Sequence, residues 1–312
     1  MNVLGVFDGI STGHYCCNQA GILVDKYFSS EINPNAIKVS EKNYPDIIRL
    51  GDITQVSAKT LPKIDLIIGG SPCQGFSRGG KCLNFDDPRS KLFFEYVRIL
   101  KEIKEVNPDV KFLLENVEMN KEWVEVINEH LGVKGYSINS KLFSAHNRPR
   151  IYWTNIDFNK DIDDAGVKLL DILEDVDTTG FIEHNGILFD PRIREDCRNL
   201  VNVVDGEVRV SQATKLGYAV AENGDGVNLD FPTSKTRRGR VIKGKSACLT
   251  TSTEPLVFVN GAIRWLTITE KERLQTLPDG YTDGVSYTAR VEALGNGWTA
   301  DVITHILRGL KV

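Results

Sequence analysis

The sequence predicts an α/β protein with a Rossmann-like, mostly parallel sheet flanked by helices and a smaller second domain. Two features of the chain predict this architecture. Short apolar β-like runs alternate with helical patterns through the first half, which is typical of βαβ units on a parallel sheet. The composition then changes over 160–260, where Asp, Gly, Asn, Arg and Thr are frequent and no long helical period occurs.

The β-like runs are NVLGVF, ILVDKYF, KIDLIIGG and VKFLLEN, and each precedes a segment able to form a helix. Residues 90–106 repeat apolar side chains at helical spacing, which predicts an amphipathic helix packed on the sheet. Helical patterning returns over 268–277 and at the end of the chain. We therefore expect a sheet domain over 1–160, a small irregular domain over 161–260, and a segment over 261–312 that returns to the first domain.

The composition is that of a globular protein with ample material for a buried core. Of the 312 residues, 41% are hydrophobic and 26% are charged. The six cysteines include no C-x-x-C pair and no Cys/His cluster at zinc spacing, so we predict neither a disulfide framework nor a metal site. The first residues lack a basic leader, and no apolar run is long enough to cross a membrane. These features predict a cytoplasmic protein with no membrane partner.

The charge of the chain gives two opposing indications about nucleic acid. A net charge of -4 argues against such a partner, because phosphate binding usually leaves a basic footprint. A local run answers this objection, since residues 235–245 hold six lysines and arginines separated only by Gly, Thr, Val and Ile. Charge pattern alone leaves two interpretations of this run open, a nucleic-acid contact and a solvated loop.

The first apolar run ends in a turn, VFDGISTGH, in which Gly9 and Gly13 open a helix. Glycine lets backbone approach a ligand there, but the spacing is not the dinucleotide fingerprint, so a plain tight turn is an equal alternative. Glu31 ends the second run about 20 residues on, where enzymes with a nucleotide-type cofactor bind the hydroxyl groups of its ribose. Asp52 ends a short third β-like piece and suits an adenine amino group. Either acid alone is more often a helix cap, but together they predict a nucleotide-type cofactor site.

The most informative segment follows the fourth run, DLIIGGSPCQGFSRGG at 65–80. It places Cys73 in a Gly/Ser/Pro loop beyond the carboxyl end of a buried strand, where open α/β sheets build their active sites. A thiol acts as a nucleophile once it ionises, and nearby backbone N–H groups or a basic side chain favour the thiolate. An inert, half-buried cysteine is the alternative for any single cysteine.

A second group of polar residues follows the next strands. Glu115 and Asn116 end the run KFLLEN and should face the same crevice as Cys73. A carboxyl group at the end of an apolar strand is costly to bury unless it is paired or protonated, so we predict a working acid. Arg148 and Arg150 precede another strand, and alternation predicts that they point to the same side.

Five blocks in this order, FDGISTG, GGSPCQGFS, ENVE, NRPRIYW and GNGW, resemble the conserved blocks of the DNA (cytosine-5) methyltransferase family. The resemblance covers nearly the whole chain except about 160–235. FDGISTG and the Trp of GNGWTADVITHIL are similar to the catalytic domain of the animal de novo enzymes, whereas Gln74 and Asn296 are similar to bacterial members. The resemblance implies the S-adenosylmethionine-dependent methyltransferase fold, with 1–160 as the catalytic domain and 161–260 as a target-recognition domain.

The resemblance also implies the residues of the site. Cys73 would attack carbon 6 of a cytosine, Glu115 would contact ring nitrogen 3 and the exocyclic amine, and Arg150, with Arg148 beside it, would hold the base oxygen. No metal is required. The residues implied around S-adenosylmethionine are Phe7, Asp8, Gly9, Ile10, Thr12, Glu31, Asp52, Ile53, Pro72, Leu92, Asn296 and Trp298.

The substrate implied by the resemblance is double-stranded DNA, from which the target cytosine must be flipped out. DNA contacts would come from Gln74, Ser77, Lys235, Arg237, Arg238 and Arg240. The loop 78–90 could close over the base as a lid, with a static loop as the alternative. Restriction–modification is one role that fits, and a eukaryotic member would be nuclear. The recognition domain is shorter than in many bacterial relatives, which leaves the recognised sequence undefined.

Three rival functions compete with this interpretation. A cytosine-5 methyltransferase acting on transfer RNA would share the fold and the cysteine chemistry, but the block around Cys73 looks more like the DNA enzymes. A non-catalytic DNA-binding subunit should lack the nucleophile or the acid, and Cys73, Glu115 and Arg150 are all present. A Rossmann dehydrogenase is disfavoured because the first turn lacks the dinucleotide spacing.

Overall fold

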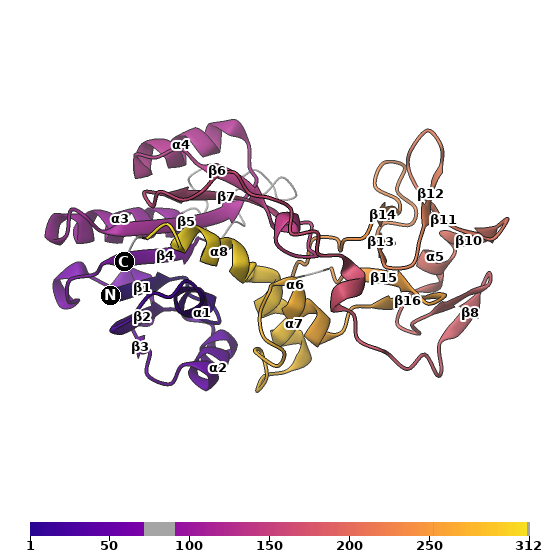
Figure 1. Cartoon of the computed structure of the whole chain (residues 1–312), viewed down its shortest axis with the longest axis horizontal. Coiled ribbons are helices and arrows are strands. Elements are labelled where there is room, and N and C mark those ends of the chain that lie inside the picture. Colours follow the sequence, from indigo (N-terminus) through magenta and orange to yellow (C-terminus); the bar gives the residue numbers. More distant parts are fainter. Residues whose placement is uncertain (72–90, 252, 311–312) are drawn as a thin grey trace. The chain divides into compact units, whose positions relative to one another are not determined.

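The computed structural model describes residues 1–71, 91–251 and 253–310 (Figure 1). Four predicted site residues, Pro72, Cys73, Gln74 and Ser77, lie outside the described residues, and so does the proposed lid at 78–90. The chain divides into two compact units. The first comprises Met1–Asn139, Pro149–Ile162 and Tyr281–Val312, and the second comprises Ser140–Arg148 and Asp163–Gly280.

Within the described residues, the first unit is built on a seven-stranded sheet of order β3-β2-β1-β4-β5-β7-β6. Its strands are β1 (Asn2–Val6), β2 (Lys26–Ser30), β3 (Ile48–Arg49), β4 (Leu66–Gly70), β5 (Lys111–Val117), β6 (Tyr136–Asn139) and β7 (Pro149–Thr154). The strands from β3 to β5 run parallel to one another, and β7 is antiparallel to both of its neighbours. The predicted, largely parallel α/β sheet is confirmed.

In the described part of the first unit, the α-helices are α1 (Thr12–Gln19), α2 (Pro34–Asn43), α3 (Lys91–Val106), α4 (Lys121–Leu131), α7 (Tyr287–Asn296) and α8 (Ala300–Leu307). Local sequence fixes several of their ends. Asn33 caps α2 by accepting hydrogen bonds from two backbone N–H groups, and Pro34 stands in the first turn, where its missing N–H costs nothing. Gly132 ends α4 with a φ of 71°, a backbone conformation that glycine adopts without strain.

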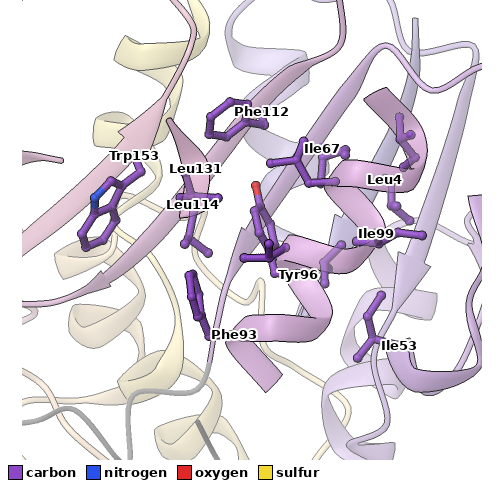
Figure 2. Packing of buried hydrophobic residues seen from close by; sticks show 14 of the residues in the cluster. Leu4, Ile53, Ile67, Phe93, Tyr96, Ile99, Phe112, Leu114, Leu131 and Trp153 are labelled. Carbon is purple, nitrogen blue, oxygen red and sulfur yellow. The ribbon is translucent and has the colours of Figure 1, made fainter. Parts of the chain in front are cut away.

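One face of the sheet packs on α3 and α4, because alternate strand residues point to alternate faces. Leu4, Ile67 and Leu114 share a buried cluster with Tyr96 and Ile99 of α3 (Figure 2). The helix predicted over 90–106 is confirmed as α3, whose 16 residues carry an apolar stripe against this face.

The opposite face of the sheet carries the other half of each strand. Ile68 points to this side, and a Cβ built on Gly13 of α1 would lie 3.4 Å from the Ile68 side chain. Helix α8 packs against α1, and the Cys16 thiol donates to the Ala300 carbonyl at 3.3 Å. Residues that continue this alternation therefore face the layer that contains α1 and α8.

In the described part of the second unit, short strands form a three-stranded sheet, β10-β11-β12, and a six-stranded sheet, β14-β13-β15-β16-β9-β8. The two sheets share a buried core that includes Phe189, Val210, Val227 and Ile263. The elements are β8 (Ile182–His184), β9 (Ile187–Phe189), α5 (Glu195–Arg198), β10 (Val201–Val204), β11 (Glu207–Ser211), β12 (Tyr218–Ala221), β13 (Asp225–Asn228), β14 (Arg240–Ile242), β15 (Leu256–Val259), β16 (Ala262–Trp265) and α6 (Ile268–Leu274).

The second unit is more regular than its sequence indicates, and its limits differ from the predicted 161–260. It includes Ser140–Arg148, and it extends to Gly280, so that the chain returns to the first unit at Tyr281 and not at 261. Helix α6 belongs to the second unit because its polar side chains are buried there. Arg264 pairs with Glu270 at 2.8 Å, and the ammonium of Lys271, which is fully buried, pairs with Glu254.

None of the helices in the described ranges combines the length and the apolar character that crossing a bilayer requires.

Removing a core side chain of β1 should destabilise the first unit far more than the same change on its surface. Leu4 is fully buried and Leu23 is 78% exposed. We expect Leu4→Ala to lower the free energy of unfolding by about 2–5 kcal/mol, because it leaves a cavity, and Leu23→Ala to change it by less than about 0.5 kcal/mol. Urea unfolding of both variants measures the difference, and equal effects would contradict the core described here.

Candidate active site

The strand order places the site. β1 has β2 on one side and β4 on the other, so the order of strands reverses between β1 and β4. Open α/β sheets bind ligands outside the carboxyl ends of the strands at such a point, because the two connections leave in opposite directions and open a crevice. The turn after β1, Ser71 after β4 and Glu115 in β5 all belong to this end of the sheet.

The turn between β1 and α1 has an unusual backbone. Phe7, Gly9 and Ser11 have φ values of 55°, 56° and 57°, in the left-handed region where residues other than glycine are strained. Glu31 holds this turn, because its Oε2 accepts a hydrogen bond from the Gly9 N–H at 2.8 Å. Its Oε1 accepts from the N–H groups of Ile32 and Asn33, both at 2.8 Å. The structure thus joins Gly9 and Glu31, which the sequence predicted as parts of one cofactor site.

Asp8 lies beneath this turn and is 8% exposed. The Tyr27 hydroxyl donates to Asp8 Oδ1 and the Ser11 hydroxyl donates to Oδ2, both at 2.6 Å. Burial raises the pKa of the Asp8 carboxyl above its usual value, although the hydrogen bonds from Ser11 and Tyr27 act against it. These contacts give Asp8 a role in holding the turn, and its contact with the cofactor stays a prediction. Tyr27 is a part of this network that sequence reasoning missed.

The other predicted cofactor residues come from five places in the first unit. Asp52 caps a short 3₁₀ helix, Ile53–Gln55, and its Oδ1 accepts from the Thr54 N–H at 2.9 Å, while its carboxylate remains exposed. Ile10 and Thr12 are buried in the turn and in the start of α1, Leu92 is half-buried in the first turn of α3, and Asn296 is exposed at the end of α7.

Glu115 is the centre of the polar site in β5 and is 8% exposed. Its Oε1 lies 3.0 Å from Nε of Arg150, and its Oε2 accepts a hydrogen bond from the indole N–H of Trp298 at 3.1 Å. It is paired in register with Gly70 of β4. Arg150, which the resemblance places at the base oxygen, contacts Glu115 directly, and neither this contact nor that of Trp298 with Glu115 was predicted.

Asn116 fixes the residue that leads into the predicted nucleophile loop. Its side-chain amide, buried at 1% exposure, donates to the Ser71 hydroxyl at 3.0 Å and to the Ser71 carbonyl at 3.3 Å. Ser71 is the last described residue before Pro72 and Cys73. The sequence placed Asn116 at the right strand end but gave no signal for this pairing, which joins residues 45 positions apart.

Arg148 has described partners in the second unit. Its guanidinium donates to the Leu249 carbonyl at 2.7 Å and to the Cys248 sulfur at 3.5 Å. The alternation expected for Arg148 and Arg150 does not extend to Arg148, because β7 begins at Pro149. A role for Arg148 at the base stays a prediction.

The basic run divides into two parts. Lys243 pairs with Glu222 and Asp225 at 3.2 and 3.0 Å, and the Lys245 ammonium donates to the carbonyls of Lys141, Ser144 and Val167. Both therefore stabilise the second unit. Among the side chains predicted to contact DNA, Lys235, Arg237 and Arg240 are exposed. The Arg237 guanidinium lies 4.2 Å from the centre of the Phe231 ring. Arg238 is half-buried and donates to the Gln212 carbonyl at 3.3 Å.

Two cysteines in the described residues are poor candidates for a nucleophile. Cys16 and Cys17 of α1 are fully buried. Burial raises the pKa of the Cys16 thiol far above its usual value and that of Cys17 to about 12, so both stay protonated near neutral pH. A search of the described residues for three or more His, Cys, Asp or Glu side chains able to hold a metal finds no such group.

The fold is shared with solved methyltransferase structures. The structure is similar to methyltransferase EhMeth of Entamoeba histolytica, with a TM-score of 0.68 and 16% identity, and to Dnmt2 methyltransferase of S. pombe, with a TM-score of 0.64 and 19% identity. Each comparison covers 99% of this chain and 97% of the other. The fold is that of the S-adenosylmethionine-dependent methyltransferases.

The family follows from the sequence comparisons. The profile of the C-5 cytosine-specific DNA methylases matches residues 1–311. The type II methyltransferase M1.ScrFI of Lactococcus lactis subsp. cremoris is 32% identical over 294 residues, which cover 88% of this chain and 68% of that enzyme. M.NgoBV of Neisseria gonorrhoeae is 38% identical over 165 residues, which span 47% of this chain and only 38% of that enzyme. The chain belongs to the C-5 cytosine-specific DNA methylase family, as the resemblance predicted.

The buried Asp8 should make stability depend on pH in a defined direction. Because its pKa is raised in the folded state, the native chain binds the proton more tightly than the unfolded chain, whose pKa is close to 3.8. The stability that Asp8 contributes is therefore lost as pH rises above that value through the folded pKa. We expect the unfolding free energy of the wild type, relative to Asp8→Asn, to fall between about pH 4 and about pH 7.

Urea unfolding of both proteins at the two pH values measures this difference. The variant Asp46→Asn, at an exposed position, is the control for loss of one negative charge. A difference that grows with pH would show that the hydrogen bonds, and not burial, govern the Asp8 carboxyl.

Proposed function

We propose that this chain transfers a methyl group from S-adenosylmethionine to carbon 5 of a cytosine in double-stranded DNA, with Cys73 as the covalent nucleophile. The observation that carries the proposal is the buried Glu115 carboxylate, held by Arg150 at 3.0 Å at the strand end next to the segment that leads to Cys73. Membership of the cytosine-5 methylase family and the type II methyltransferases among the relatives support the same activity.

The chemistry follows from the poor nucleophilicity of carbon 5. The Cys73 thiolate adds to carbon 6, and the pair of the 5,6 double bond moves into the bond between carbons 4 and 5. The pair of the double bond between carbon 4 and nitrogen 3 moves to nitrogen 3, to which Glu115, in its acid form, donates a proton or hydrogen bond. Arg150 fixes the carboxylate and the base oxygen. Carbon 5 then takes the methyl group, whose former bonding pair stays on the sulfur of the donor, and a base removes the carbon-5 proton. The pair left at carbon 5 re-forms the 5,6 double bond and expels the Cys73 thiolate, while nitrogen 3 returns its proton to Glu115.

The turn after β1 and the Glu31 carboxylate that accepts its hydrogen bond fit an adenosine-type cofactor. The turn has left-handed backbone at Phe7, Gly9 and Ser11, and Glu31 follows the end of β2, where a ribose would meet a carboxylate. Asp52 is exposed three residues after β3, where it caps the short 3₁₀ helix. When bound, S-adenosylmethionine supplies the methyl group, and these residues would hold its ribose and adenine.

The target base must leave the duplex to reach Glu115, at a cost of a few kcal/mol of unstacking and unpairing. We propose that the second unit carries sequence recognition and that Lys235, Arg237 and Arg240 meet the DNA. Their exposure supports this role, whereas Lys243 and Lys245 are engaged within the unit. The bacterial type II relatives support a role in restriction–modification and a cytoplasmic location.

The reaction is tested by transfer of labelled methyl from S-adenosylmethionine to unmodified duplex DNA and, in parallel, to transfer RNA. We expect label in 5-methylcytosine of DNA, a loss of at least about 10³-fold in Cys73→Ser, and a loss of about 10²–10⁴-fold in Glu115→Gln. The Cys197→Ser variant is the control, because that thiol is half-buried in the second unit and its pKa is raised by burial. Label in transfer RNA alone, or full activity without Cys73, would overturn the proposal.

The DNA contacts are tested by the salt dependence of binding. Each phosphate contact that is lost should reduce the slope of log K against log salt by about 0.9. We expect Arg237→Gln to reduce the slope by about this amount and Lys243→Gln, which removes the same charge from an internal pair, to leave it nearly unchanged. Fluorescence anisotropy with a labelled duplex measures both slopes, and identical slopes for the two variants would remove Arg237 from the DNA interface.

A further inference from the structure

Trp298, predicted as a cofactor residue, also contacts Glu115, the acid of the proposed reaction. Its indole N–H donates to Glu115 Oε2 at 3.1 Å, while Arg150 Nε lies 3.0 Å from the other oxygen. The two donors therefore approach different oxygens of one carboxylate. A carboxylate with a donor at each oxygen has a fixed plane, whereas a single donor leaves the group free to turn about its last bond.

The position of the indole is set by the backbone of the first unit. Trp298 stands between α7 and α8, two residues before Ala300 begins α8. Helix α8 is in turn fixed to α1, where the Cys16 thiol donates to the Ala300 carbonyl at 3.3 Å. The N–H group that reaches Glu115 therefore belongs to a segment that is anchored to a packed helix.

The space around the pair is closed on the side of β4. A Cβ built on Gly70 would lie 2.9 Å from the indole nitrogen, closer than real Cβ contacts come, and 3.0 Å from Glu115 Oε2, which is tighter than most of them. Any side chain at this position would displace one of the two groups. The absence of a side chain at Gly70 thus lets the carboxylate and the indole meet against bare backbone.

We propose that Trp298 is a positioning residue, whose indole N–H orients the Glu115 carboxylate for the ring of the flipped cytosine. The indole N–H only donates, so it can fix a carboxylate without competing with it for the proton or hydrogen bond that the base requires. This inference rests on the proposed function, in which Glu115 is the acid. It assigns Trp298 an action on the base-activation step that is separate from any contact with the cofactor.

The step to measure is exchange of the carbon-5 hydrogen of cytosine without S-adenosylmethionine. Addition of the Cys73 thiolate to carbon 6, with a proton or hydrogen bond at nitrogen 3, gives an enamine. Carbon 5 then takes a proton from water, loses its original hydrogen to a base, and expels the thiolate, which restores cytosine. DNA tritiated at carbon 5 therefore releases tritium to water at a rate that depends on Glu115 but requires no methyl donor.

We expect Trp298→Phe, which keeps an aromatic ring and removes the N–H, to slow tritium release by about tenfold or more, the effect of one hydrogen bond to a charged group. Tritium release is measured without S-adenosylmethionine, so its loss is independent of any change in the dissociation constant for S-adenosylmethionine, which equilibrium dialysis measures separately. In the Glu115→Gln background the same substitution should cause no further loss, because residues that act through one group are non-additive.

The matched control is Trp153→Phe. The Trp153 indole also donates a hydrogen bond, to Asn128 Oδ1 at 2.8 Å, but from the core of the first unit. It should lower the urea midpoint and leave tritium release by the folded protein within about twofold of wild type. Circular dichroism of each variant confirms that the folded enzyme is being measured.

The outcomes separate the two proposals. Normal tritium release by Trp298→Phe together with weakened S-adenosylmethionine binding would overturn the positioning role and leave Trp298 as a cofactor residue. An equal further loss in the Glu115→Gln background would also overturn it, because Trp298 would then act independently of Glu115. Absence of both methyl transfer and tritium release in the wild type would instead reject the proposed function itself.

Discussion

A carboxylate buried at the end of a central strand is the constraint on which the first unit depends. Glu115 is buried in β5, which lies between β4 and β7 in the sheet. Removing a partner from a buried charge costs about 3–5 kcal/mol. The surrounding elements supply what this charge needs: β7 brings Arg150, and the connection between α7 and α8 brings Trp298. Gly70 leaves the room in which the groups meet.

The fold of the first unit could be predicted because its signals are local. Apolar runs bounded by glycine and polar turns identify β1, β4 and β5, and the helical period of 91–106 identifies α3. The second unit could not be described in the same way. Its strands are three to five residues long, too short to show a period, and their pairing joins segments such as β9 and β16 that are about 75 residues apart, so it appeared irregular.

The site shows the same division between local and distant information. The order of Gly9, Glu31 and Asp52 along the chain was enough to predict neighbouring strand ends, since parallel strands bring these ends to one edge. The donation from Trp298 to Glu115 spans 183 positions, and no local pattern reports it. The separate partners of Arg148 and Arg150 also depend on where β7 begins, and sequence patterns locate element ends least well.

The packing of α8 on α1 has a consequence for synthesis in the cell. The contact between Cys16 and Ala300 joins positions 284 residues apart, so a ribosome making about 5–20 residues per second needs roughly 15–60 s to produce the second partner after the first. During this interval the apolar layer of α1 and of the strands beneath it has no covering helix. The nascent chain must therefore be protected from aggregation, by chaperones or by a provisional collapse, until α8 leaves the ribosome.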